Sequence, residues 1–363
     1  MNKIKYPWAI PDIGEEERLA VDEALKSGWI SGTSPYNELF EKAFAKTVRA
    51  KYAVSVSNGT AALILGLMAI ERNLNLKPRT KMSIVVPTWT YIATANAANL
   101  MGMIRLADCG QDTFCIKISG IPDSQVMMPV DVGGCPCEYD ELKNLGWNPI
   151  LFADSAESMG SMYKGHPVGS QALLHMFSLH ATKIITTGEG GMLTTNDLKL
   201  YEQLKCLNNQ GHPIGYKTSD YEHPELGYNF RMPAPQAAMG IVQLKKLPGY
   251  LKKREEFSHI YSDIIGDKVR YQFIPSYTKS CNFLFTILVD PNQKADFMNE
   301  MLKQGIQTKS WKPVHMQPCY SFWNTIKFPN AEDLYSRNVH LPIHNKLSDE
   351  DVKIIAETAK SLL

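Results

Sequence analysis

The chain has 363 residues, of which 44% are hydrophobic and 21% are charged, and its formal net charge is +1. This composition is typical of a soluble globular enzyme, and the near-neutral charge argues against a nucleic-acid-binding protein, which usually carries a basic face. No run of about 18 uncharged apolar residues predicts a membrane-spanning helix, and the first residues lack the apolar core of a signal peptide. We therefore expect a cytoplasmic protein with no nucleic-acid or membrane partner.

Helical patterns and short apolar strands alternate through the first two-thirds of the chain. Two helices are predicted over residues 15–28 and 37–48, with apolar faces that include Leu25 and Leu39, respectively. Residues 51–70 and residues 82–102 are each predicted to form a strand, a turn and a helix. Four more strands are predicted, over residues 103–109, 126–132, 149–155 and 173–179. Strands interleaved with helices at this spacing predict a mainly parallel sheet that helices cover on both faces.

The pattern changes after about residue 246. A long charged helix is predicted over residues 245–265, interrupted near its start by Pro248 and Gly249. A strand over 283–290, a helix over 293–305 and a closing helix over 347–363, with Ser348 and Asp351 as its cap, complete the chain. Because the chain is longer than one core usually organises, we predict a large α/β domain, residues 1–246, and a smaller α+β domain, residues 247–363.

The cysteines do not predict a metal site. There are seven of them, an odd number with no regular spacing, which argues against a disulfide framework and indicates a reducing compartment. Cys135 and Cys137 form the one close pair, and no second pair stands at the spacing of zinc ligands.

Ligands of a mainly parallel sheet collect at the carboxyl ends of its strands. Residues 57–60, 88–91 and 154–160 each follow a predicted strand, so we expect them to converge there. Lys183 follows another strand, within "FSLHATKIITTGEGGMLTTND". Burying an unpaired ammonium is costly, so a lysine in this apolar and hydroxylic run needs a chemical partner.

The stretch "SNGTAAL" at residues 57–63 is a candidate phosphate site. Small and hydroxylic residues open an apolar helix there, and the first amides of a helix, together with its dipole, favour an anion. The stretch is not a Walker motif, and any Asn-Gly turn before a helix looks similar.

Trp89 and Asp154 each admit more than one interpretation. Trp89, at a strand-to-helix turn, either packs in the core or stacks on a planar ligand. Asp154 ends an apolar strand and is a helix N-cap, half of a buried ion pair, or the partner of a ligand cation.

Pyridoxal phosphate explains these features together. Its phosphate binds a helix N-terminus, its ring is stacked, its pyridinium nitrogen pairs with an aspartate, and its aldehyde forms a Schiff base with a lysine. Lys183 is then not buried as a bare charge, because it is joined covalently to the cofactor.

Seven motifs resemble, in their order, the sugar aminotransferases of the DegT/DnrJ/EryC1/StrS family, which have the fold-type I, aspartate aminotransferase-like architecture. The resemblance covers nearly the whole chain. The motifs are "SGWIS", "SNGTAAL", "VPTWTYIATANA", "ADSAESMGSMYKGHPVGS", "FSLHATKIITTGEGGMLTTND", "LGYNFRMPAPQAAMGIVQLKKL" and "WKPVHMQP".

The resemblance implies the roles of several residues. Lys183 corresponds to the Schiff-base lysine, Asp154 to the partner of the pyridine nitrogen, and Trp89 to the ring-stacking aromatic. Asn229 corresponds to an asparagine that reaches the phosphate in the neighbouring subunit, which implies a homodimer with shared active sites. The implied phosphate contacts within the subunit are Gly59, Thr60, Ala61 and Ser178.

Other positions bear on the substrate. Glu157 stands where many members carry Gln or His near the phenolic oxygen of the cofactor. His315, in a segment that the family uses near the sugar nucleotide, and Trp89 are expected on the substrate side; a hydrogen-bonded loop histidine is the alternative for His315. A dehydrating branch of the family carries His at the position of Lys183, and this chain does not.

The activity implied is transfer of an amino group from L-glutamate to C4 of a nucleotide-linked 4-keto-6-deoxyhexose. "SGWIS" and "WKPVHMQP" resemble members that aminate C4. A GDP-linked product of the perosamine type and a UDP- or dTDP-linked product of the viosamine type both fit. The alternatives are a nucleotide-sugar 3-aminotransferase or dehydratase, and a non-catalytic regulatory member of the same fold.

Overall fold

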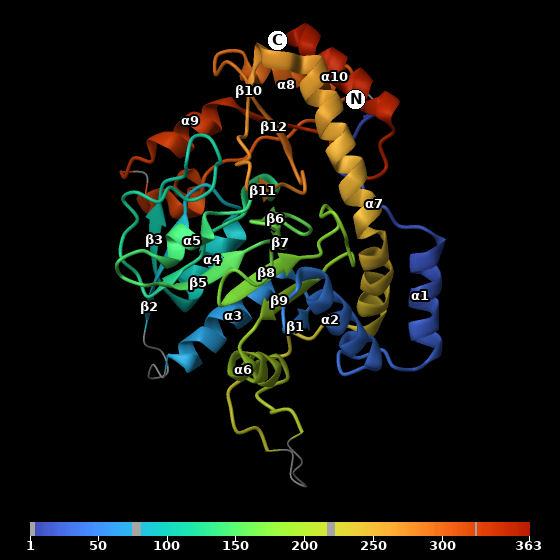
Figure 1. Cartoon of the computed structure of the whole chain (residues 1–363), viewed down its shortest axis with the longest axis vertical. Helices are drawn as coiled ribbons and strands as arrows, with labels where there is room; N and C mark the ends of the chain where they lie inside the picture. The colour runs from blue at the N-terminus through green and yellow to red at the C-terminus, as the bar shows by residue number, and fades with distance from the viewer. Residues whose placement is uncertain (1–3, 75–80, 216–221, 324) are drawn as a thin grey trace.

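The computed structural model describes residues 4–74, 81–215, 222–323 and 325–363. A seven-stranded sheet organises the larger part of the chain (Figure 1). Its strands lie in the order β1 (Tyr52–Val56), β9 (Gly191–Thr195), β8 (Leu174–Ser178), β5 (Ile150–Asp154), β4 (Val126–Met127), β2 (Met82–Pro87) and β3 (Gly102–Ala107). The five strands β8, β5, β4, β2 and β3 are parallel to one another. The strand β9 runs antiparallel to both of its neighbours, β1 and β8. The predicted mainly parallel sheet is confirmed.

Helices cover both faces of this sheet. On one face lie α3 (Gly59–Asn73), α4 (Ile92–Met101) and α6 (Leu198–Asn208), which share an apolar cluster with strand residues such as Phe152 and Leu174. The packing of α3 is close: a Cβ on Gly66 would lie 2.4 Å from the Phe152 ring. On the other face, α2 (Pro35–Val48) and α5 (Tyr139–Lys143) pack on side chains that alternate with these along the strands.

Two predictions about the first helices are wrong in detail. Leu25 of α1 (Glu15–Lys26) is 55% exposed and Leu39 of α2 is 57% exposed. The helix α1 instead buries Glu17, which forms an ion pair of 2.7 Å with Lys246 and accepts a hydrogen bond from Gln243. A charged residue paired across a helix contact can therefore replace the apolar face that the sequence pattern suggests.

The long helix α7 (Ala234–Ile265) is continuous, so the predicted interruption at Pro248 and Gly249 is wrong. A proline within a helix removes one backbone hydrogen bond, but here Leu247 and Tyr250 on either side are buried, and α1, α2 and α10 pack along the helix. The helix runs from the large sheet to the C-terminal region (Figure 1). The predicted boundary between residues 246 and 247 would fall inside it, and the division into two domains stays a prediction.

The C-terminal region has a sheet and core of its own. The antiparallel sheet has the order β10 (Arg270–Tyr271), β12 (Phe285–Leu288) and β13 (Asn338–Leu341). Its core includes side chains from α7, α8 (Lys294–Lys303) and α10 (Asp349–Leu362). The predicted cap of the last helix is confirmed, since the Ser348 hydroxyl accepts from the Asp351 amide while the Asp351 carboxylate accepts from the Ser348 amide.

Short elements complete the fold. A second small sheet has the order β11 (Thr278–Lys279), β6 (Met162–Tyr163) and β7 (His166–Pro167), and α9 (Pro329–Arg337) precedes β13. The 3₁₀ helices are η1 (Val132–Gly134), η2 (Gly266–Lys268), η3 (Val314–Met316) and η4 (Pro318–Trp323). Across the four described stretches, no helix combines the length and the apolar character needed to cross a membrane.

Candidate active site

A cavity of about 610 Å³ lies where the carboxyl ends of β1, β2, β5 and β8 meet. Loops and strand ends far apart in the sequence supply its wall, as expected at this edge of a parallel sheet. Six of the predicted site residues line it together: Gly59, Thr60, Asp154, Glu157, Ser178 and Lys183. Ala61, Trp89, Asn229 and His315 are not among the residues that line it.

The N-terminus of α3 forms one end of the cavity. The side chain of Asn58 caps the helix by accepting a hydrogen bond of 2.8 Å from the Ala61 amide, so this amide is already occupied within the protein. The amides of Gly59 and Thr60 precede the first hydrogen bond within the helix, from Ala62 to Asn58, so they are available to an anion.

Only a residue without a side chain fits at position 59 without disturbing its neighbours. A Cβ on Gly59 would lie 3.3 Å from both the Cβ and the hydroxyl of Ser178, at the end of β8. The Ser178 hydroxyl and the first amides of α3 therefore face the same small space, which is the donor set that a phosphate requires.

Asp154 ends β5 and is 4% exposed. One carboxylate oxygen accepts a hydrogen bond of 2.6 Å from the Thr94 hydroxyl on α4, and the other accepts one of 3.1 Å from the Ala156 amide. Burial raises the pKa of Asp154 above its usual value, against the opposing effect of both hydrogen bonds and of the Lys183 charge. No helix begins at Asp154, so the N-cap interpretation does not apply.

Lys183 lies opposite a second buried carboxyl group. Its Nζ atom is 3.8 Å from Glu157 Oε1 and 4.4 Å from the centre of the Phe283 ring. The other Glu157 oxygen accepts a hydrogen bond of 2.8 Å from the Gly133 amide in η1. Burial raises the pKa of Glu157 from 4.5 to about 7, although the Lys183 charge opposes this effect.

The structure does not bring Trp89 to the cavity. Trp89 is 2% exposed and packs in the apolar cluster beneath α3 and α4. Of the two alternatives for Trp89, packing in the core therefore applies. Tyr91, two residues later at the start of α4, is 69% exposed and lines the cavity. The sequence carries both aromatic residues in one turn, and only the path of that turn decides which of them faces the ligand.

His315 is also placed behind the wall and not on it. It is 2% exposed, and its Nδ1 atom is 2.7 Å from the hydroxyl of Thr88, the residue that follows β2. Its Nε2 atom lies 3.6 Å from Glu332. His315 therefore supports the turn of residues 88–91 from the side that faces away from the cavity.

Asn229 is exposed and lies outside the cavity of its own chain. The segment that carries it is fixed beside the phosphate end of the cavity, because the Ser57 amide donates a hydrogen bond of 2.7 Å to Phe230. The residues that line the cavity and that the sequence did not single out include Trp8, Lys309 and Trp311.

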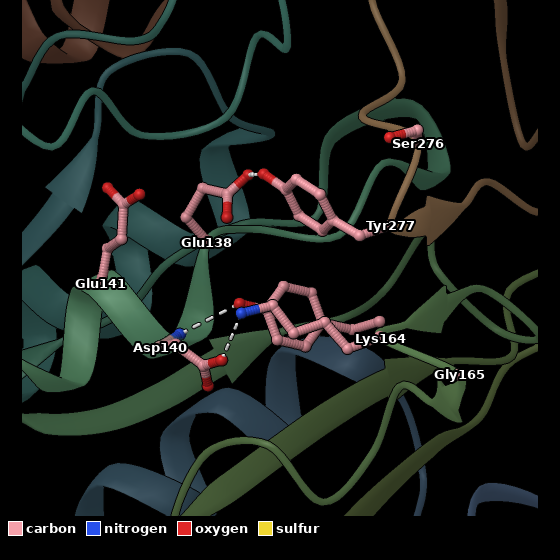
Figure 2. A pocket seen from close by; sticks show the side chains of 8 residues that line it. Glu138, Asp140, Glu141, Lys164, Gly165, Ser276 and Tyr277 are labelled. Atoms are coloured by element: carbon pink, nitrogen blue, oxygen red, sulfur yellow. Dashed lines mark hydrogen bonds and ion pairs between the residues drawn. The ribbon is translucent and has the colours of Figure 1, made fainter.

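A second hollow, of about 540 Å³, opens on the surface beside β6 and β11 (Figure 2). Its charged side chains are largely paired with one another. Asp140 accepts a hydrogen bond of 2.6 Å from Lys164, and Tyr277 donates one to Glu138 (Figure 2). We assign no ligand to this hollow.

The cysteine pair lies in the core beneath η1. Cys137 Sγ donates to the Val130 carbonyl at 3.1 Å, and the neighbouring thiol of Cys115 donates to the Cys135 carbonyl at 3.3 Å. In the parts of the chain that the structure describes, no group of three or more His, Cys, Asp or Glu side chains is arranged to hold a metal ion.

The fold and the cavity together define a pyridoxal-phosphate-dependent aminotransferase of fold type I. A phosphate cradle at a helix N-terminus, a buried carboxylate held by two donors, and a lysine beside a second carboxyl group match the parts of this cofactor. The profile of the DegT/DnrJ/EryC1/StrS aminotransferase family matches residues 11–360, and the chain belongs to this family.

Two relatives of known name match almost end to end. The GDP-perosamine synthase of Escherichia coli O157:H7 is 34% identical, over 98% of each chain. The UDP-4-amino-4,6-dideoxy-N-acetyl-beta-L-altrosamine transaminase of Campylobacter jejuni subsp. jejuni serotype O:23/36 is 32% identical, over 97% of this chain and 96% of the relative.

Solved structures agree with this assignment. PseC of Helicobacter pylori, an aminotransferase involved in the biosynthesis of pseudoaminic acid, superposes with a TM-score of 0.90 at 28% identity and covers 98% of both chains. The PLP form of the putative sugar aminotransferase Spr1654 of Streptococcus pneumoniae superposes with a TM-score of 0.87 at 27% identity, again over 98% of both chains.

Proposed function

We propose that this aminotransferase moves an amino group from L-glutamate to C4 of a nucleotide-linked 4-keto-6-deoxyhexose. The observation that carries the proposal is the convergence of Lys183, Asp154 and the N-terminus of α3 in one cavity. The match to a GDP-perosamine synthase over 98% of both chains supports a sugar substrate. Relatives named for GDP-linked and for UDP-linked sugars are almost equally similar, so the proposal covers both nucleotides. It also covers dTDP, because the sequence motifs fit a dTDP-linked product as well.

The site would hold the cofactor through residues already in place. The Gly59 and Thr60 amides and the Ser178 hydroxyl would bind its phosphate, and Asp154 would pair with its ring nitrogen. Tyr91, which lines the cavity as Trp89 does not, would be the aromatic side chain that covers the ring. When bound, pyridoxal phosphate supplies an electron-withdrawing ring and an aldehyde that accepts and returns an amino group.

Asp154 contributes a fixed negative charge. Its two hydrogen bonds, from Thr94 and Ala156, hold the carboxylate in one orientation and favour its ionised form against the cost of burial. A cation placed against it would gain from the water-poor surroundings, because electrostatic attraction strengthens as the local dielectric falls.

Lys183 and Glu157 are placed to hold and move protons. The Lys183 amine would hold the aldehyde of the cofactor, and as a free amine it could accept and return a proton as a general base. Glu157 Oε1, 3.8 Å away, can take up or release a proton near neutral pH because its pKa is about 7. The Gly133 amide keeps the Glu157 side chain turned toward Lys183.

We further propose a homodimer with shared active sites. Two observations support this proposal: Asn229 is exposed, and its segment is hydrogen-bonded beside the phosphate end of the cavity. Replacing Asn229 with Ala should weaken cofactor retention in the dimer. An active monomer in analytical ultracentrifugation would exclude sharing.

A panel of nucleotide-linked keto-sugars tests the function. The purified protein, loaded with pyridoxal phosphate, is incubated with glutamate and GDP-, UDP- or dTDP-linked 4-keto-6-deoxyhexose, and the products are analysed by mass and NMR. Transamination replaces the ketone oxygen with an amino group at C4. Loss of water without gain of nitrogen would instead identify a dehydratase, and amination at C3 would identify a 3-aminotransferase.

One further measurement distinguishes the proposed enzyme from a non-catalytic regulatory member of the family. Such a protein could bind the cofactor and absorb visible light, but glutamate would not bleach that band. Bleaching by glutamate, followed by recovery with a keto-sugar, would establish both half-reactions of the proposed enzyme.

A further inference from the structure

One wall of the cavity is built from two segments that are far apart in the sequence. Tyr6 and Ile306 form a parallel bridge, and the Gln307 side chain accepts a hydrogen bond of 3.1 Å from the Trp8 amide. Trp8 and Lys309 therefore lie on neighbouring segments of the same chain, and both line the cavity. None of the roles proposed so far uses this wall.

The backbone of this wall is held firmly. Lys309 exchanges backbone hydrogen bonds of 3.2 and 2.7 Å with His340 on β13. Trp311, two residues later, donates from its amide to the Asn338 side chain at 2.8 Å, and its ring packs 4.9 Å from that of His340. The position from which the Lys309 side chain extends is thus set by the C-terminal sheet.

Among the described residues that line the cavity, Lys309 is the cation without a charged partner. The Lys183 amine faces Glu157 at 3.8 Å, and His180 lies 3.7 Å from Glu189. Within the described residues, the Lys309 ammonium has neither an ion-pair nor a hydrogen-bond partner, although it lies on a wall that also carries Trp8 and Trp311. Trp8 and Trp311 are half-buried and Lys309 is exposed, so the ammonium can be reached by a ligand that enters the cavity.

Both substrates of the proposed reaction carry an oxyanion that needs such a partner. The amino donor has carboxylates, and the nucleotide sugar has a diphosphate. The other charged residues lining the cavity are the acids Asp154, Glu157 and Glu189, together with Lys183 and His180. Lys183 is committed to the cofactor, and a carboxylate or phosphate placed near the acids without a cation would be unfavourable.

We infer that Lys309, which lines the cavity together with Trp8 and Trp311, is the oxyanion subsite of this enzyme and binds a substrate carboxylate or diphosphate. This inference rests on the proposed function, because it takes the substrates from it. A charge-assisted hydrogen bond to Lys309 should tighten binding about 10- to 100-fold. We expect its contribution to fall on substrate binding and not on the cofactor, since none of the cofactor contacts proposed above uses Lys309.

The test uses Lys309→Met in the cofactor-loaded protein and follows the two half-reactions separately. Glutamate bleaches the visible cofactor band, and a nucleotide keto-sugar restores it. We expect the half-saturating concentration to rise about 10- to 100-fold in the half-reaction whose substrate supplies the oxyanion. Cofactor content and the unliganded spectrum should remain unchanged, and Lys309→Arg should restore most of the affinity. The matched control is Lys312→Met, three residues away and outside the cavity lining, which should leave both half-reactions unchanged.

A calorimetric arm is independent of turnover. Glutarate serves as a carboxylate that cannot transaminate, and GDP and UDP serve as diphosphates. Weaker binding of glutarate alone to Lys309→Met would assign the donor carboxylate, and weaker binding of GDP or UDP alone would assign the diphosphate. Dissociation constants equal to those of the wild-type protein, or no binding of any probe by the wild-type protein, would overturn the inference. Absence of both wild-type half-reactions would refute the proposed function, and the calorimetric comparison would still decide the role of Lys309.

Discussion

The buried Glu157 allows a quantitative prediction of pH-dependent stability. Its pKa rises from 4.5 to about 7 on folding because the side chain is only 7% exposed. One pKa unit corresponds to ~1.4 kcal/mol, so ionising Glu157 costs about 3 kcal/mol more in the folded protein than in the unfolded chain. Glu157→Gln removes this cost and keeps the size of the side chain, and the amide oxygen can still accept from Gly133.

The direction of the effect follows from proton binding. The folded protein holds the Glu157 proton more tightly than the unfolded chain does, so the stabilisation from this group is complete below pH 4.5 and is lost as the pH rises through 7. The variant and the wild-type protein should therefore have similar free energies of unfolding at pH 4.5. At pH 8 the variant should be more stable by about 3 kcal/mol.

Urea unfolding of the cofactor-free proteins, at one protein concentration and several pH values, measures this difference. Glu256→Gln is a suitable control, because Glu256 is 52% exposed and pairs with Lys252 at 3.9 Å, a contact of little energetic value. The free energy of unfolding of Glu256→Gln should stay close to that of the wild-type protein at every pH. If Glu157→Gln were equally or less stable at pH 8, the attraction of Lys183 for the ionised carboxylate would outweigh the cost of burial, and the reasoning would be wrong.

Three further substitutions test the site and the packing. Lys183→Ala should abolish the visible band of the lysine-linked cofactor, and an absorbance spectrum that keeps the band would place the link elsewhere. Asp154→Asn should keep some cofactor but lower the rate of bleaching by glutamate at least about a hundredfold; near-normal rates would mean that another residue faces the ring nitrogen. Gly66→Ala should lower the free energy of unfolding by about 1–3 kcal/mol, because its Cβ would lie 2.4 Å from the Phe152 ring. Alanine has the better helix propensity, by about 1 kcal/mol, so an unchanged urea midpoint would show that α3 can shift to accommodate it.

The order and type of the main elements could be predicted because the signals are local. A short apolar run that ends in a polar residue favours a strand, and β5, which ends at Asp154, and β8, which ends at Ser178, follow this pattern. The continuity of α7 could not be predicted, since the hydrogen bond that Pro248 removes is offset by packing against helices distant in the sequence. The burial of Glu17 depends in the same way on Lys246, which lies 229 residues away.

The residues of the candidate site likewise fall into those that local sequence signals predict and those that only the folded chain reveals. Lys183, Asp154 and the "SNGT" turn at the start of α3 each carry a chemical signal within a few residues, and their convergence follows from the rule for parallel sheets. Trp89 and Tyr91 are two residues apart in a turn, where no periodicity assigns a face.

The sequence by itself therefore determined the class of chemistry and predicted the residues proposed to carry it, because reactive side chains at strand ends are recognisable without their neighbours. Only the tertiary structure decided that Tyr91 and not Trp89 faces the cavity, that His315 lies behind Thr88, and that Lys309 stands beside Trp8. These outcomes depend on contacts between segments up to about three hundred residues apart, and contacts of that kind leave no pattern in any one stretch of the chain.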